Sequence, residues 1–243
     1  MTALSDSFSW LVRGADALAI PLTEAQLNQF DSYRALLLDW NKRLNLTAIT
    51  EDKDIQVRHF LDSISCSLVT GDLNESSLID VGAGGGFPGV PLKILFPTLK
   101  LTLVDSVTKK TAFLQALIEE LGLSNVQVMD ERIEVIGQDP DYRESFDWAA
   151  ARAVAEMSTL VEYLLPLCRI GGHALAQKGV GAADELDAAA GAITLLGGGA
   201  QSLTPVALLD SSALHYLVKI QKIGPTPEKY PRRPGIPSKR PLI

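Results

Sequence analysis

Apolar residues at helical spacing characterise the first third of the chain. After Thr23 they recur every three or four positions as Leu27, Phe30, Leu37, Trp40 and Leu44, with Tyr33 on the flank. This spacing predicts an amphipathic helix, and Thr23 and Gln26 have the spacing of a capping box at its start. A second helix is predicted from Asp54 to about Val69. Because no run before residue 75 has the pattern of a strand, we expect residues 1–74 to form a helical cap.

Short apolar runs alternate with helical segments from residue 75 onward. The runs predicted to be strands are 78–81, 101–104, 126–129, 146–151, 174–177 and 214–220. Helices are predicted at 88–96, 108–121, 156–165 and 184–196. Buried strands that alternate with helices form a mostly parallel sheet covered on both faces. The predicted fold class is therefore α/β, with a doubly wound, Rossmann-like sheet, and a turn at 210–212 is compatible with an antiparallel last strand.

The end of the chain differs in composition from the sheet region. After the predicted sheet domain at 75–223, residues 224–243 contain six prolines, which exclude regular structure and predict an extended segment. From Lys219 to Ile243, seven bases and one acid give a charge of +6, whereas the rest of the chain carries −13. A basic, extended tail on an acidic body is a candidate site for nucleic acid, although a solvated terminus has the same pattern.

Composition limits the class of protein. With 243 residues, 47% hydrophobic and 21% charged, the chain can bury a core and is not disordered as a whole. It begins with no basic signal-peptide region and has no run of ~18 apolar residues that could span a membrane. Two cysteines, Cys66 and Cys168, fit a reducing compartment. We therefore expect a soluble cytoplasmic protein and, because no spacing of Cys, His and acids fits one, no metal site.

The glycine-rich segment after the first predicted strand is the main candidate for a ligand-binding loop. Residues 84–89 match G-x-G-x-x-G, which on its own is weak evidence for a dinucleotide. Residues 80–86 also read D-x-G-x-G-x-G, which resembles motif I of the class I methyltransferases. An acid at the strand end, Asp80, suits the sulfonium and amino group of S-adenosylmethionine better than it suits a pyrophosphate. Asp105, at the end of the second strand, is placed to bind a ribose in either cofactor.

A specific combination of motifs resembles the small-subunit rRNA methyltransferase G family. The motifs are Asn45-Leu46-Thr47, Arg58-His59-Phe60-Leu61-Asp62-Ser63, the segment from Asp80 to Gly89, Asp105-Ser106, Arg132-Ile133-Glu134, Ala151-Arg152-Ala153, Gln177-Lys178-Gly179 and the tail from Lys229 to Leu242. The resemblance implies a class I enzyme that transfers a methyl group from S-adenosylmethionine to N7 of one guanine in 16S rRNA, in the loop near the decoding centre. It also implies a partner, which is 16S rRNA within the small ribosomal subunit or an assembly intermediate.

The resemblance also proposes the site residues. Those expected to bind the cofactor are Asp80, Gly82, Gly84, Phe87, Asp105, Ser106, Val107, Ile133, Glu134 and Arg152. Those expected to bind RNA are Asp62, Lys109, Lys229, Arg232, Arg233, Lys239 and Arg240. The expected catalytic residues are Arg152, His59 and Lys178. Each of these three also has a structural alternative, because a buried charge or imidazole needs a partner whether or not it has a function.

The chemistry around the fourth strand agrees with an N7 target. Ala151-Arg152-Ala153-Val154 stands where enzymes that methylate exocyclic amines carry an Asn/Asp-Pro-Pro-aromatic box. Guanine N7 already holds a lone pair and no proton, so the reaction needs no general base and depends on alignment. Neither cysteine follows this strand or a proline, which argues against a covalent cytosine-C5 route. We expect Cys66 and Cys168 to pack as small hydrophobes, and His173 and His215 to be structural.

Two other functions stay open from the sequence alone. An NAD(P)-dependent oxidoreductase would explain the G-x-G-x-x-G match, but it needs a hydride-transfer constellation that is not visible in the sequence. A non-catalytic RNA-binding module would explain the basic tail, but the intact Asp80, glycine loop and Asp105 argue against a decayed site.

Overall fold

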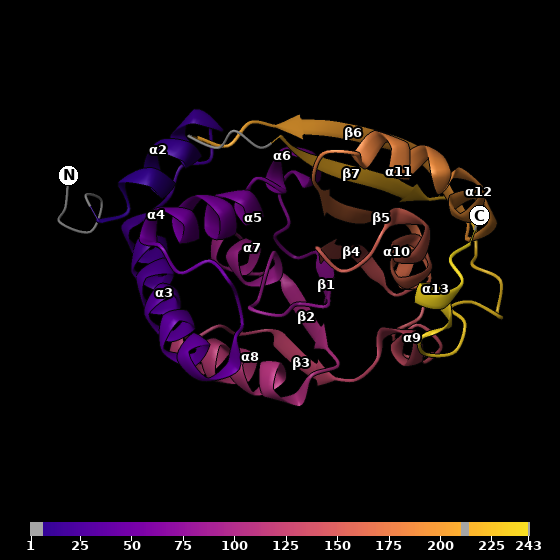
Figure 1. Cartoon of the computed structure of the whole chain (residues 1–243), viewed down its shortest axis with the longest axis horizontal. Helices are drawn as coiled ribbons and strands as arrows, with labels where there is room; N and C mark the ends of the chain where they lie inside the picture. The colour runs from indigo at the N-terminus through magenta and orange to yellow at the C-terminus, as the bar shows by residue number, and fades with distance from the viewer. Residues whose placement is uncertain (1–6, 210–213, 243) are drawn as a thin grey trace.

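A seven-stranded sheet runs through the middle of the computed structural model, which describes residues 7–209 and 214–242 (Figure 1). Its strands are β1 (Ser77–Val81), β2 (Lys100–Asp105), β3 (Val126–Asp130), β4 (Phe146–Arg152), β5 (Cys168–Lys178), β6 (Gly198–Val206) and β7 (His215–Lys222). The order is β3-β2-β1-β4-β5-β7-β6, with β1 to β5 parallel and β7 antiparallel to both neighbours. The predicted doubly wound, mostly parallel sheet is confirmed.

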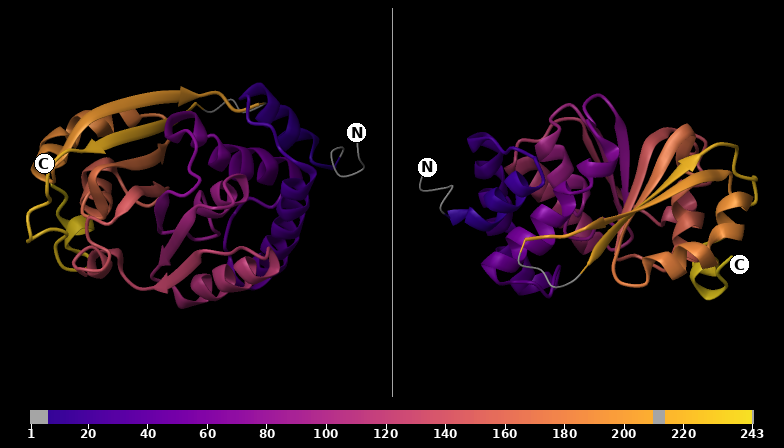
Figure 2. Two further views of the ribbon diagram at one scale, coloured as in Figure 1. Left: turned by 180° about the vertical axis from the view of Figure 1, so that it is seen from behind. Right: turned by 90° about the horizontal axis from the view of Figure 1, so that it is seen from above.

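Helices cover both faces of the sheet, and each face has its own hydrophobic core. Along β1, Leu78 points into one core and Ile79 into the other, as alternation along a strand requires. The first core lies under α3 (Glu24–Leu44), α7 (Gly89–Leu95) and α8 (Thr108–Glu120). The second lies under α9 (Ile133–Ile136), α10 (Met157–Leu164), α11 (Ala182–Ala188) and α12 (Ala190–Leu195). Figure 2 shows these two layers on opposite sides of the sheet.

The long helix α3 begins at the predicted capping box. The Thr23 hydroxyl accepts from the Gln26 amide at 3.3 Å, and the Gln26 side chain accepts from the Thr23 amide at 2.8 Å. The helix ends at Asn45, whose φ of 49° places it in the left-handed region where helices commonly stop. Another helix, α2 (Ser9–Ala17), was not predicted. It lacks a side-chain cap and contains Gly14, where an added Cβ would clash with the Leu61 side chain.

The second predicted helix is confirmed but is not a regular α-helix. It runs through α4 (Asp52–Asp54), the π-helical segment η1 (Ile55–Leu61) and α5 (Asp62–Ile64), and is followed by α6 (Ser67–Thr70). Within η1 only Arg58 is exposed. Wide π-helical turns are frequent at functional sites because they change the direction of side chains relative to an α-helix. Here the turn carries Arg58 and His59.

Three elements near the end of the chain differ from the sequence prediction. Strand β6 was missed because it begins with glycines and contains Pro205, which a sheet tolerates only at an edge such as this one. The single helix predicted at 184–196 is two helices that meet at Ala189. The proline-rich tail is irregular over most of its length, but Ile236–Lys239 forms the short helix α13.

A buried lysine joins the last strand to the start of the tail. Lys222 is 0% exposed, and its ammonium donates to the carbonyls of Leu165 at 2.9 Å and Leu196 at 3.0 Å, and to the Thr226 hydroxyl. Glu144 lies 3.1 Å from the same nitrogen. Burial lowers the pKa of Lys222, and Glu144 opposes that shift.

We expect Lys222→Met to lower the free energy of unfolding by about 2–4 kcal/mol, because buried acceptors left unsatisfied cost about 1–3 kcal/mol each. Urea unfolding would measure it. The control is Lys219→Met on the same strand, since Lys219 makes one 3.3 Å bond to the Val69 carbonyl. Equal losses in the two variants would contradict a special role for the buried ammonium.

Candidate active site

The glycine loop between β1 and α7 needs glycine for two reasons. Gly82 and Gly86 have φ values of +69° and +95°, which strain any other residue. A Cβ would also lie 2.8 Å from the Val154 side chain at Gly82 and 2.6 Å from the Tyr33 hydroxyl at Gly86. Tyr33 donates a hydrogen bond to the Gly85 carbonyl, so α3 of the N-terminal region holds the loop directly.

Two carboxylates hold the loop by accepting hydrogen bonds from its backbone amides. Asp105 accepts from the Gly84 amide at 3.0 Å and from the Val107 amide at 2.9 Å. Asp80 is fully buried and accepts from the Gly89 amide at 2.7 Å with one oxygen. Its other oxygen has no hydrogen-bond partner within the described residues. Burial raises the pKa of Asp80 to about 7, against the opposing effects of the Gly89 hydrogen bond and the Arg152 charge.

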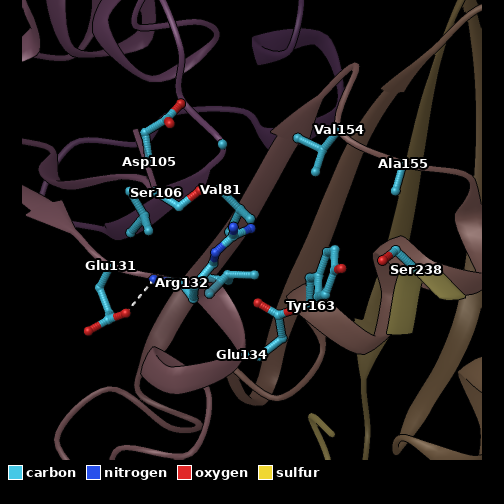
Figure 3. A pocket seen from close by; sticks show the side chains of 13 residues that line it. Val81, Asp105, Ser106, Glu131, Arg132, Glu134, Val154, Ala155, Tyr163 and Ser238 are labelled. Carbon is cyan, nitrogen blue, oxygen red and sulfur yellow. Dashed lines mark hydrogen bonds between the residues drawn. The ribbon is translucent and has the colours of Figure 1, made fainter. Parts of the chain in front are cut away.

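A cavity of about 290 Å³ opens beside the loop, at the carboxyl ends of β1 and β2. Its lining residues are Val81, Gly82, Val104, Asp105, Ser106, Glu131, Arg132, Ile133, Glu134, Val154, Ala155, Tyr163 and Ser238. Figure 3 shows Asp105 and Ser106 on one side, and Tyr163 and Ser238 on the other. The Arg132 side chain points into the space between them.

The tail forms part of the wall of this cavity. Ser238 lines it, and three residues earlier the Gly235 amide donates to Glu134, another lining residue, at 2.8 Å. The Arg232 guanidinium donates three hydrogen bonds to the Glu162 carboxylate, at 2.6, 2.9 and 3.1 Å. Glu162 is 0% exposed, so its charge depends on this partner.

Further contacts fasten the tail to the body of the protein. Arg143 donates to the carbonyls of Thr226 at 2.7 Å and Tyr230 at 2.6 Å, and Gln138 donates to that of Pro231 at 2.8 Å. Tyr230 and Pro237 are buried. The expectation of a wholly extended tail is therefore wrong. Prolines prevented long regular structure, but internal carboxylates and Arg143 supply the partners that hold the segment down, as seen beside α9 and α10 in Figure 1.

A second group of polar side chains gathers over the other face of the sheet, around Arg152. The Arg152 guanidinium donates to Asp62 at 3.2 Å and to the Arg58 carbonyl at 3.0 Å, and it lies over the Phe87 ring. The residues that follow it, Val154 and Ala155, line the cavity. The end of β4 therefore connects the cavity to this cluster.

His59 is a neutral member of the cluster. Its Nδ1 lies 3.2 Å from an Arg152 nitrogen, which can only donate, so Nδ1 is the acceptor. Its Nε2 then donates to the Thr47 hydroxyl at 2.8 Å. Burial, with the charge of Arg152, lowers the pKa of His59 to about 3. With both nitrogens occupied and the ring stacked on Phe87, His59 positions its neighbours.

Lys178 and His215 each hold one neighbouring segment. The Lys178 ammonium donates to the Ala155 carbonyl and to Glu185, both at 2.6 Å, and so fixes a loop that lines the cavity.

His215 was expected to be structural, without chemistry around it. Instead its Nδ1 lies 3.2 Å from one oxygen of Asp62, and Arg152 contacts the other oxygen. No local pattern indicates this contact, because the two residues are 153 positions apart.

The structure divides the expected cofactor residues into two groups. Those that line the cavity are Gly82, Asp105, Ser106, Ile133 and Glu134. Those that lie outside its lining are Asp80, Gly84, Phe87, Val107 and Arg152, which hold the loop or belong to the Arg152 cluster. Lining residues that the sequence analysis did not assign include Arg132, Tyr163 and Ser238. One feature of the sequence did indicate that another segment packs on α10. Glu162 is an acid within an apolar stretch of that helix, and a buried acid needs a partner.

The expected RNA-binding residues also divide. Those exposed at the surface are Lys109, Lys229, Arg233, Lys239 and Arg240. Asp62 is 4% exposed and paired with Arg152, and Arg232 is paired with Glu162. In the part of the chain that the structure describes, no group of His, Cys and acids could hold a metal ion. No described helix is long and apolar enough to cross a membrane.

Comparisons with known sequences agree on one family. The family model described as rRNA small subunit methyltransferase G matches residues 26–211. A Ribosomal RNA small subunit methyltransferase G from Roseiflexus castenholzii is 52% identical, over 96% of this chain and 99% of its own length. One from Alkaliphilus metalliredigens is 45% identical, over 94% and 96%. A predicted O-methyltransferase from Agrobacterium tumefaciens, 15% identical, covers 65% of this chain and 79% of its own with a TM-score of 0.55, and so shares the fold.

The pairing of Arg232 with buried Glu162 generates a stability prediction. Arg232→Met should lower the free energy of unfolding by about 3–5 kcal/mol, because it leaves a buried carboxylate without its cation. Urea unfolding monitored by tryptophan fluorescence would measure the loss. Arg233→Met is the matched control, since Arg233 is exposed, and it should change stability by less than about 0.5 kcal/mol. A loss as small as the control's would show that the tail is not held by this pair.

Proposed function

The chain belongs to the rRNA small subunit methyltransferase G family, and we propose on that basis that it transfers the methyl group of S-adenosylmethionine to N7 of a guanine in 16S rRNA. The observation that carries the proposal is the cavity at the carboxyl ends of β1 and β2, bounded by Gly82 and Asp105. Ligands of doubly wound folds bind at the carboxyl ends of the strands, near the point where the strand order reverses, which here lies between β1 and β4.

The residues around the cavity fit S-adenosylmethionine. Asp105 retains acceptor capacity for ribose hydroxyls beyond its two backbone bonds, because a carboxylate has about four lone-pair sites. Ile133 and Tyr163 provide apolar surface for an adenine. Gly82 lines the cavity without a side chain, and a Cβ there would lie 2.8 Å from the Val154 side chain, another part of the lining. When bound, the cofactor supplies an electrophilic methyl group on sulfur.

The protein's own task in this reaction is alignment. Guanine N7 attacks through a lone pair that carries no proton, so no general base is needed. This agrees with the state of His59, which is neutral and has both ring nitrogens engaged. Arg152 is held by Asp62, His59 and the Arg58 carbonyl in one orientation next to the loop that lines the cavity. We assign Arg152 to the substrate side, His59 to its positioning, and Lys178 to holding the loop at Ala155.

RNA docking is assigned to exposed cations. The body is acidic, and although Lys222 and Arg232 are paired with Glu144 and Glu162, the exposed cations of the segment from Lys219 onward provide the positive charge that phosphates require. Exposed members of that segment are Lys229, Arg233, Lys239 and Arg240, and Lys109 lies at the start of α8. These contacts position the enzyme without reading bases. The substrate we propose is 16S rRNA within the small ribosomal subunit or an assembly intermediate.

Incubation with labelled S-adenosylmethionine tests this function directly. Free 16S rRNA, assembly intermediates and mature small subunits, each lacking the modification, would be compared as substrates. The modified base would then be mapped by mass spectrometry. We expect one N7-methylguanine in 16S rRNA, and label on another base or on protein would overturn the proposal. No observation favours the oxidoreductase alternative.

A first prediction concerns the cofactor. Asp105→Asn should weaken binding of S-adenosylmethionine by about 1.5–3 kcal/mol, the range for hydrogen bonds to a charged group. Calorimetry would measure the affinity. Asp147→Asn serves as the control, because Asp147 holds Ser77 and Arg169 at the opposite edge of the sheet. An unchanged affinity in folded Asp105→Asn would remove this carboxylate from the cofactor site.

A second prediction concerns alignment. Arg152→Lys keeps the charge but loses the planar fork that contacts Asp62, His59 and the Arg58 carbonyl at once. We expect kcat to fall by about 100-fold, the effect of a small misplacement of reacting groups. Cofactor affinity should change little, since Arg152 does not line the cavity. A variant with normal kcat would show that the network is only structural.

A further inference from the structure

Two cationic side chains from separate strands contact one buried carboxylate, and a third lies close enough for its charge to act on one of them. Asp62 of α5 is 4% exposed and lies 3.2 Å from Arg152 of β4 and 3.2 Å from His215 of β7. The third, Arg58 of η1, gives its carbonyl to Arg152 and keeps a side chain that is 51% exposed. We propose that Arg58, Arg152 and His215 form a binding site for a phosphate of the RNA, next to the nucleotide that is methylated. The inference rests on the proposed function.

The charges in the cluster do not cancel. Asp62 carries one negative charge and is shared between Arg152 and His215. His59 is neutral and adds none. The side chain of Arg58 has one acid nearby, Asp54 at 3.7 Å, and that pair is exposed on both sides and therefore weak. With His215 protonated, the cluster has an excess of positive charge on a body that is otherwise acidic.

The cluster is also accessible and has donors to offer. The exposed fractions of the side chains are 51% for Arg58, 26% for His215 and 16% for Arg152. A guanidinium has five N–H groups, and the bonds of Arg152 within the described residues use three of them. The remaining donors sit on a group that is already fixed in orientation, so a ligand would not have to order it.

The position suits a phosphate more than a base or the cofactor. The cluster lies over the first core, whereas the cavity lined by Ile133 and Tyr163 lies over the second. The two meet at the end of β4, where Arg152 belongs to the cluster and Val154 to the cavity. A nucleotide whose base enters at this junction would leave its backbone on the cluster side. Arginine recognises phosphate oxygens through paired N–H groups.

His215 makes the site dependent on pH. The hydrogen bond to Asp62 raises the pKa of His215, against burial and the charges of Arg58 and Arg152. The chain has three histidines. The pKa of His59 falls to about 3 and burial lowers that of His173, so neither gains a proton in the range where His215 does. RNA affinity should therefore be high when His215 is protonated, and should fall as the pH rises through its pKa.

The test measures KM for 16S rRNA in small-subunit particles between pH 6 and 9, for native protein and His215→Gln. In the native protein we expect KM to rise about tenfold across the range, the scale of one hydrogen bond to a charged group. His215→Gln should have a high KM at pH 6 that converges with the native value at pH 9. Affinity for S-adenosylmethionine should stay the same in both. His173→Gln, at a histidine stacked on Trp148, is the matched control and should retain the native pH profile.

A second variant keeps the test informative if His215→Gln folds poorly. Arg58→Gln should raise KM at both ends of the pH range and reduce the slope of log affinity against log salt by roughly 0.7, the value for one phosphate contact on a single strand. A defect of His215→Gln that is constant with pH, or an unchanged salt slope in Arg58→Gln, would overturn the phosphate site. Methyl transfer to 16S rRNA would persist in that case. If the native protein instead transferred no methyl group to any of the rRNA substrates, the proposed function itself would be overturned.

Discussion

A charge that is mostly removed from water must be compensated, and at the carboxyl edge of this sheet one pair meets that requirement. Arg152 and Asp62 lie 3.2 Å apart, with exposed fractions of 16% and 5%. Because the guanidinium is planar and its donors point in fixed directions, its partners must also be fixed. They are contributed by η1, α5 and the glycine loop. The helical N-terminal region, the sheet and the loop therefore all contact the Arg152–Asp62 pair. The charge of Arg152 adds to burial in lowering the pKa of His59, which keeps that imidazole neutral.

The sequence predicted the parts of the molecule that depend on local patterns. Alternation of short apolar runs with helices gave the parallel sheet, and Thr23 with Gln26 gave the start of α3. The glycine loop and Asp105 could be recognised because backbone conformation and close approach restrict the residue type there. Strand β6 could not, since its glycines and Pro205 have low strand propensity. It is stabilised by pairing with β7, which is a tertiary effect.

The rest of the site escaped the sequence because it is made by contacts between distant segments. Nothing near His215 in the chain reveals that Asp62 will face it. The tail was expected to be extended because of its prolines, and its positive charge was assigned to RNA. In the folded protein Arg232 instead compensates Glu162, a buried acid on α10. A charged residue within an apolar helix indicates that a partner exists, but it does not say where in the sequence that partner lies.

The wall that the tail contributes has a consequence for how the protein is made. A ribosome synthesises the chain from its amino terminus, so the glycine loop and Asp105 are complete well before Gly235 and Ser238 emerge. Until then Glu162 lacks its cation and one side of the cavity is open. A nascent chain can thus assemble the sheet without having a finished pocket. Loss of this short stretch would therefore leave a folded sheet whose pocket lacks one wall.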